Sequence, residues 1–210
     1  MFRLRGRAAG PLLLVGLILI SSPGLRAQES SDNKASDNRA AADEEYEIYS
    51  AMIKELYVKP ESKLLMIEER TFRYDFSGGD EQPWRDKPKG LSIDESAVQD
   101  YESKNRGQTL LNKASFKLPV KSEMITDADL RTIFHGHWGE LEWTEYYRRF
   151  PASDGFIMLS RVGFNTAHTQ ALLYIGSRSG PGYGEIHFLL LEKANGTWSI
   201  KKQLRKNKFG

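Results

Sequence analysis

The chain has 210 residues, with 30 Lys and Arg against 28 Asp and Glu, and it contains no cysteine. This length fits one domain plus a tail, and a hydrophobic content of 40% is sufficient for a packed core. The lack of cysteine excludes disulfides, zinc–thiolate sites, a cysteine nucleophile and lipidation of a cysteine. A net charge of +2 argues against a strongly basic nucleic-acid binder, so we expect no nucleic-acid partner.

Residues 1–27 have the three parts of a secretory signal peptide. Three arginines within the first seven residues precede an uncharged, mostly apolar run over 8–20, and Leu-Arg-Ala at 25–27 offers a cleavage site. A membrane span needs roughly 20 apolar residues, so we expect cleavage and no stable membrane span afterwards; an uncleaved anchor is the alternative. The protein is therefore predicted to be exported, either periplasmic or secreted. The segment holds four of the 30 basic residues and no acid, which leaves 26 basic and 28 acidic residues.

The remaining chain begins with a predicted spacer over 28–42, followed by a single domain over 43–210. The spacer contains no large apolar side chain that could offset the entropy of ordering. The domain is expected to open with a helix that has Asp43 as its N-cap and ends before Pro60. Its apolar side chains recur at steps of three and four, which predicts a buried face. The residues of that face are Tyr46, Tyr49, Ile53 and Leu56.

The middle of the domain predicts one strand and three short helices. The strand begins at Leu64, and its alternation continues to Phe76, before a loop over 77–92 that is rich in Gly, Pro and charge. A short extended piece is expected over 116–120. The helices are expected over 94–101 with Ser92 or Asp94 as cap, over 126–134, and over 140–150.

The C-terminal third predicts an antiparallel meander of four strands. These strands are expected over 155–164, 169–176, 185–193 and 198–204. Asn195-Gly196 is typical of a type I′ hairpin turn, because both residues tolerate positive φ. Asn195-Gly196-Thr197 also matches the sequon for N-glycosylation, but the hairpin turn is the better explanation of this sequence. Helices first and a meander last predict an α+β fold, with N-terminal helices packed on a C-terminal antiparallel four-stranded meander.

One sequence pattern extends through this domain. Its segments are Trp143-Thr144-Glu145-Tyr146-Tyr147-Arg148-Arg149-Phe150-Pro151, Leu159-Ser160-Arg161-Val162-Gly163-Phe164-Asn165, Ala171-Leu172-Leu173-Tyr174-Ile175-Gly176, Leu190-Leu191-Glu192-Lys193 and Gly196-Thr197-Trp198, and Ile48–Met52 and Leu65–Ile67 also fit it. This pattern resembles a family of exported bacterial proteins to which no activity is assigned. The resemblance extends over most of residues 46–200. It implies export and a shared fold only.

His135 and His137, with Glu140 close by, form the nearest approach to a metal motif. Imidazoles and a carboxylate are suitable ligands for zinc or copper. A further ligand would have to come from the sheet, as His168 or His187. We therefore predict no metal and no other cofactor, and we interpret the segment as a polar loop before an aromatic helix.

The glycine-rich connection over 176–184 is a candidate ligand-binding loop. It resembles an anion cradle with Arg178 as counter-charge, but phosphate loops lead from a strand into a helix, whereas this one leads into another strand. A flexible or bulged hairpin is the expected structure, and such a loop could form the mouth of a ligand pocket. The candidate ligand-binding residues are Arg178, Tyr183 and the aromatic Trp138.

The aromatic residues that follow Trp138 also allow two interpretations. Exposed rings could stack on sugars or on a partner surface. On a helix, however, these rings occupy one face at spacings of three, four and seven, which predicts core packing. The rings concerned are Trp143, Tyr146, Tyr147 and Phe150.

Four polar residues of the C-terminal strands are the candidate catalytic residues, namely Ser160, Arg161, Glu185 and His187. A serine nucleophile needs a base within reach and an oxyanion hole. No Gly-x-Ser-x-Gly sequence is present, and no catalytic motif is identified. We favour a structural role for Arg161, paired across the sheet with an acidic residue. The acidic residues considered are Glu69, Glu185 and Glu192.

Three hypotheses of function follow. The leading one is an exported, non-catalytic binding or interaction domain of the cell envelope, whose partner is a protein or a small ligand. The alternative is a hydrolase-like enzyme with a site on the sheet face. The third is a structural or assembly protein of the envelope, tethered by the spacer and marked by a large exposed apolar patch.

Overall fold

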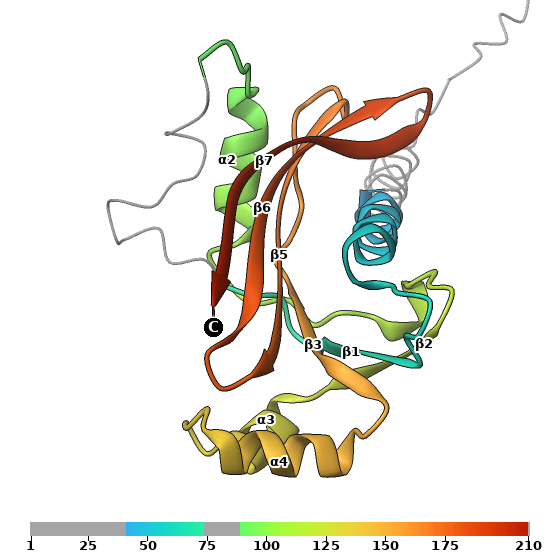
Figure 1. The fold of residues 1–210 in the computed structure, drawn as a ribbon. Helices are drawn as coiled ribbons and strands as arrows, with labels where there is room; N and C mark the ends of the chain where they lie inside the picture. Colours follow the sequence, from blue (N-terminus) through green and yellow to red (C-terminus); the bar gives the residue numbers. More distant parts are fainter. Residues whose placement is uncertain (1–40, 74–88, 210) are drawn as a thin grey trace, which may run out of the picture. The chain divides into compact units, whose positions relative to one another are not determined.

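The structure is a computed structural model that describes residues 41–73 and 89–209, with side chains described up to residue 204 (Figure 1). The predicted signal peptide and nearly all of the predicted spacer lie outside the described residues, as does most of the predicted loop over 77–92. These parts of the sequence therefore stay predictions. Among the described residues, no helix combines the length and the apolar character that crossing a membrane requires.

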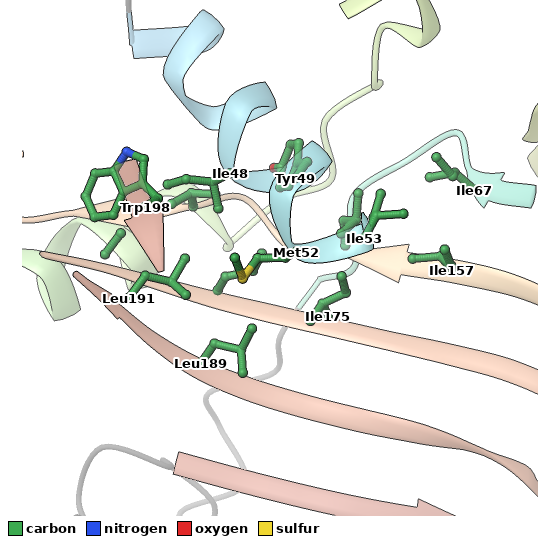
Figure 2. Packing of buried hydrophobic residues seen from close by; sticks show 14 of the residues in the cluster. Ile48, Tyr49, Met52, Ile53, Ile67, Ile157, Ile175, Leu189, Leu191 and Trp198 are labelled. Atoms are coloured by element: carbon green, nitrogen blue, oxygen red, sulfur yellow. The ribbon is translucent and has the colours of Figure 1, made fainter. Parts of the chain in front are cut away.

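Residues 41–57 are helical, and one face of this helix is buried against the sheet (Figure 2). Asp43 is inside the helix, so its prediction as N-cap is wrong. Tyr46 and Leu56 are only partly buried, so the buried face is rotated from the predicted stripe. The most deeply buried residues of this face are Ile48, Tyr49, Met52 and Ile53. Full burial of an aliphatic or aromatic side chain stabilises a fold by about 1.5–3 kcal/mol.

The three other predicted helices are confirmed, with small shifts at their ends. The helix α2 spans Glu95–Lys104, and the Asp94 side chain caps it by accepting a hydrogen bond from the backbone N–H of Ser96 at 2.9 Å. The helix α3 spans Asp127–Phe134 and begins with the Thr126 capping box. The helix α4 spans Glu140–Arg149. Caps of this kind satisfy backbone N–H groups that have no partner inside the helix.

The strands form one mixed sheet in the order β2-β1-β3-β5-β6-β7, with β4 paired to β5. The strands β1 and β2 are parallel to each other, and β1 is parallel to β3, whereas the remaining pairs are antiparallel. Asn195 and Gly196 have φ of 50° and 78°, as expected for the hairpin between β6 and β7. The strands span Leu64–Glu68 (β1), Lys121–Ile125 (β2), Ser153–Leu159 (β3), Gly163–Phe164 (β4), Gln170–Gly180 (β5), Tyr183–Ala194 (β6) and Thr197–Phe209 (β7).

The predicted α+β class is confirmed, but a four-stranded antiparallel meander is wrong as a description of the sheet. The expected meander is β3, β5, β6 and β7, and the chain adds β1 and β2 in parallel beside β3. The strand β1 ends at Glu68, short of the predicted end, because the backbone N–H groups of Thr71 and Phe72 donate to Thr109 and Leu159, which lie in different segments. The predicted strand over 155–164 is divided into β3 and β4.

Successive strand residues point to opposite faces of the sheet, and each face has its own helices. Helix 41–57 covers the face that contains Ile157, Ile175 and Leu189. The opposite face contains two clusters. In one, α2 packs on β5 and β6, and in the other, α3 and α4 pack on β1 and β3. Figure 1 shows α2 beside β5–β7, with α3 and α4 near the other end of these strands.

The aromatic residues of α4 pack into the second of these clusters, as their spacing predicts. Trp143 and Tyr146 are buried, while Tyr147 and Phe150 are partly buried against the same cluster. Trp143 stacks on Phe156 of β3, with ring centroids 5.9 Å apart. The helical periodicity of this segment therefore indicates core packing and not an exposed aromatic surface.

Glu45 of helix 41–57 is a buried acidic residue that joins the helix to the segment between β3 and β4. Only 5% of Glu45 is exposed. Its carboxylate accepts hydrogen bonds from Tyr49 Oη at 2.7 Å, Arg161 Nε at 2.8 Å and the Val162 N–H at 2.7 Å. Arg161 therefore pairs with Glu45, and its predicted pairing with Glu69, Glu185 or Glu192 is wrong. The reason is that Arg161 follows the end of β3 and faces the helix.

The neighbouring Glu44 makes a second attachment, to the hairpin between β6 and β7. Its carboxylate contacts Lys193 Nζ at 2.6 Å, His168 Nδ1 at 2.6 Å and Trp198 Nε1 at 3.1 Å. Burial raises the pKa of Glu44, but the hydrogen bonds from Lys193, His168 and Trp198 outweigh this effect and lower the pKa overall. Two adjacent glutamates thus attach one helix to two separate parts of the sheet.

Candidate functional site

The main candidate site is a cavity of about 390 Å³ on the sheet face that carries α2, α3 and α4. It opens between the cluster under α2 and the cluster under α3 and α4. This volume falls within the range of small-molecule pockets, roughly 300–1,000 Å³. Its aromatic, aliphatic and basic lining residues are Phe72, Trp138, Met158, Tyr174, Arg178, Tyr183 and Ile186. We call this the Arg178 cavity.

The strand β5 places two of these residues on one face. Tyr174 and Arg178 are four residues apart in β5, so both point to the face opposite helix 41–57. Tyr174 stacks on Phe72, with ring centroids 4.8 Å apart. The connection to β6 is the predicted hairpin, with an irregularity in register between Arg178 and Gly180. Tyr183, which is 59% exposed, begins β6 at the rim of the cavity.

The Arg178 guanidinium lies over the ring of Trp138, with Cζ 4.4 Å from the ring centroid. On the aromatic side, Trp138 stacks on Phe134 at 4.2 Å between centroids. Such a cation–π contact stabilises by about 0.5–2 kcal/mol and orients the guanidinium. No ion pair between Arg178 and an acidic side chain is found in the described part of the chain. The positive charge is therefore held in place and available to a ligand.

The three residues predicted separately as ligand-binding, Arg178, Tyr183 and Trp138, all line this one cavity. They come from three different segments, namely β5, β6 and the connection between α3 and α4. Each of them was predicted from its own side-chain chemistry, whereas their convergence depends on the fold. The sheet register and the stacking of Trp138 on Phe134 bring them together.

Glu68, at the end of β1, is a further charged group near this cavity that the sequence analysis missed. Burial raises its pKa to about 7, the positive charge of Arg178 opposes this rise, and the negative charge of Asp127 adds to it. Glu68 therefore changes its charge near neutral pH within electrostatic range of Arg178. The available signal was strand alternation, because Glu68 lies two residues from the buried Met66 and on the same face.

The four candidate catalytic residues are not joined into one site, because the Ser160 hydroxyl is not hydrogen-bonded to the side chains of the other three. The Ser160 hydroxyl donates to the carbonyl oxygen of Arg161 at 2.9 Å and accepts from the Tyr174 N–H at 3.0 Å. Both partners are backbone groups, and no side-chain base among the described residues is hydrogen-bonded to this hydroxyl. Arg161 is bound to Glu45. His187 and Glu185 do lie together, with Nε2 and Oε1 3.4 Å apart.

The histidines predicted as candidate metal ligands belong to the connection after α3. His135 is the C-terminal cap of α3, in the left-handed conformation with φ of 46°. His168 and His187, the other two histidines, contact Glu44 and Glu185 respectively. Among the described residues, no group of three or more His, Asp or Glu side chains is arranged to hold a metal ion.

Comparison with family models, with curated proteins and with solved structures finds no match to this chain. The function is therefore inferred from the site itself. The Arg178 cavity combines an apolar aromatic lining with one oriented guanidinium at its opening. Chemically, it suits a ligand that has an apolar body and a single anionic group, since guanidinium and carboxylate form strong charge-assisted hydrogen bonds.

Proposed function

We propose that the described domain is a non-catalytic binding domain, and that it holds a small, mainly apolar ligand with one anionic group in the Arg178 cavity. The observation that carries this proposal is the Arg178 guanidinium, which is held over Trp138 beside an aromatic lining and forms no ion pair in the described residues. Apolar contact with Phe72, Tyr174 and Ile186 would provide most of the binding free energy. Arg178 would select for the negative charge.

Isothermal titration calorimetry on the full chain tests this proposal with octanoate and phenylacetate as probes. Octanol and phenylethanol are the neutral controls of similar size. We expect the carboxylates to bind more tightly than the alcohols. Replacing Arg178→Met keeps an apolar stem and removes the charge. A hydrogen bond to a charged group contributes about 1.5–3 kcal/mol, so Arg178→Met should weaken carboxylate binding by roughly 10- to 100-fold.

Arg106→Met is the matched control, because Arg106 is exposed and does not line the cavity. It should bind carboxylates as the unmodified chain does. Equal affinities for a carboxylate and its alcohol would contradict the proposed ligand class. An unchanged dissociation constant in Arg178→Met would show that the anionic group lies elsewhere.

The same proposal places this domain in the cell envelope or outside the cell. Its support is the arginine-rich start and the apolar run of residues 1–27, together with the resemblance to exported bacterial proteins. Mass spectrometry of the chain purified from a bacterial periplasmic fraction should give a mass that begins at residue 28. Recovery of the uncleaved chain from the cytoplasm would contradict export. A hydrolytic function receives no support, because Ser160 is hydrogen-bonded to backbone groups.

A further inference from the structure

A second cavity, of about 320 Å³, lies beyond the end of helix 41–57, beside the β5–β6 hairpin. Tyr57 contributes from the end of that helix, Asp154 from β3, and Ser177 and Glu185 from β5 and β6. Ser177 and Glu185 are direct partners in the sheet, which fixes them side by side. We call this the Glu185 cavity. It shares Ser177 and Tyr183 with the Arg178 cavity, and its other lining residues are different.

Among the described residues, the acidic groups of this cavity are not paired with a lysine or an arginine. Neither Asp154 nor Glu185 forms an ion pair with a lysine or an arginine in the described part of the chain. The side chain of Glu185 is 26% exposed, so its carboxylate is partly withdrawn from water yet still reachable. Carboxylates in such a position gain more from a cationic partner than fully exposed ones do.

The buried side chain of His187 lies next to the Glu185 carboxylate. It is 2% exposed, and its Nδ1 accepts a hydrogen bond from the side-chain amide of Gln203. An imidazole that accepts at Nδ1 carries its proton on Nε2. This N–H lies 3.4 Å from Glu185 Oε1. The contact places one oxygen of the Glu185 carboxylate beside the buried imidazole.

The lining also has the charge and the aromatic surface that an ammonium group requires. Asp154 and Glu185 supply two negative charges, and Lys59 supplies one positive charge, which leaves a net charge of −1 at the cavity. The rings of Tyr57 and Tyr183 line the same space. Tyrosine faces attract cations through the ring quadrupole. One additional positive charge therefore neutralises the lining.

We propose that the Glu185 cavity binds a primary ammonium group on an alkyl stem, with Asp154 and Glu185 as its counter-ions and with Tyr57 and Tyr183 beside the stem. A free alkylamine and the side chain of a lysine in a peptide share this chemistry. The site differs from the Arg178 cavity in the sign of its charge, and none of its charged lining residues lines that cavity.

Calorimetric titration of the full chain with butylamine tests the proposal, with 1-butanol as the neutral control of the same length. We expect butylamine to bind at least tenfold more tightly than butanol. A lysine derivative blocked at its backbone amino and carboxyl groups forms the second arm. Binding of both amines identifies a site that admits a peptide lysine, and binding of butylamine alone identifies a site for free amines. Equal affinity for butylamine and butanol, or no butylamine binding, overturns the proposal.

Variants locate the bound charge. Asp154→Asn and Glu185→Gln should each weaken butylamine binding by about tenfold or more, and Lys59→Met should strengthen it. Glu192→Gln is the matched control, because Glu192 is also in β6 but outside the cavity. Asp154 is exposed, so Asp154→Asn remains informative if Glu185→Gln disturbs the fold. Arg178→Met should leave butylamine binding unchanged, which separates this test from that of the proposed function. Unchanged affinity in both carboxylate variants overturns the proposal.

Discussion

Glu68 provides a sharp test of the electrostatics beside the Arg178 cavity. Burial raises its pKa from the ordinary value of 4.5 to about 7. Folding therefore favours the protonated form, and the stability that Glu68 contributes is full below pH 4.5 and is lost as the pH rises through about 7. The difference between the two pKa values corresponds to a loss of about 3 kcal/mol, at 1.36 kcal/mol per pH unit. Glu68→Gln keeps the shape of the protonated side chain and removes this dependence on pH.

The assay is urea unfolding of the full chain and of Glu68→Gln at pH values from 4 to 8. At pH 4, Glu68→Gln and the unmodified chain should have nearly the same unfolding free energy. At pH 8, the unfolding free energy of Glu68→Gln should be higher by about 3 kcal/mol. Glu44→Gln is the control, because the contribution of Glu44 to stability should depend on pH in the opposite direction. Hydrogen bonds lower the pKa of Glu44, so its contribution is present above pH 4.5 and lost as the pH falls below that value.

A difference between Glu68→Gln and the unmodified chain that stays constant from pH 4 to pH 8 would refute this reasoning. It would mean that the Glu68 carboxyl has the same pKa in the folded and unfolded chain. The account of Glu68 as a group that changes charge near Arg178 would then be wrong. The proposed role of Arg178 itself would not depend on this result.

Two further predictions concern the attachment of helices to the sheet. Glu45→Ala leaves Arg161 without its buried partner and should lower the unfolding free energy by about 3–5 kcal/mol in urea unfolding; a loss below about 1 kcal/mol would contradict the buried ion pair. Gly163→Ala would place a methyl group 2.4 Å from Cβ of Tyr101 in α2. This substitution should lower the unfolding free energy by about 1–3 kcal/mol and should therefore lower the thermal midpoint. Gly107→Ala, where no atom lies within 4 Å, is the control, and equal effects of both substitutions would contradict the close packing of α2.

The helices and the C-terminal strands could be predicted because their signals are local. Asp94 and Thr126 are caps that precede short helices, and the structure uses both of them. The rotation of the buried face of helix 41–57 could not be predicted, since Glu44 and Glu45 fix it through residues far along the chain. The strand β2 was missed because Lys121-Ser122-Glu123 carries no apolar alternation. It lies at an edge of the sheet, where such alternation is not required.

The candidate binding site shows the same division between local chemistry and long-range geometry. Arg178, Tyr183 and Trp138 stand out in the sequence as polar or aromatic residues near a glycine-rich turn. Their convergence depends on β5 pairing with β3 and on the return of the chain through α3 and α4 to the same face. Glu68 was missed because a glutamate at the end of a strand gives no local sign that burial will raise its pKa.

The attachments of helix 41–57 also bear on how the chain acquires its structure. The helix is synthesised before every strand, yet Glu44 meets Trp198, 154 residues later, and Tyr49 meets the carbonyl of Ser160, 111 residues later. Contacts so distant in sequence slow folding, because a long loop must close before they form. The apolar face of this helix therefore lacks Ile175, Leu189 and Leu191 as partners until β5 and β6 have left the ribosome. A chain truncated before β5 should present part of that face to solvent and to chaperones.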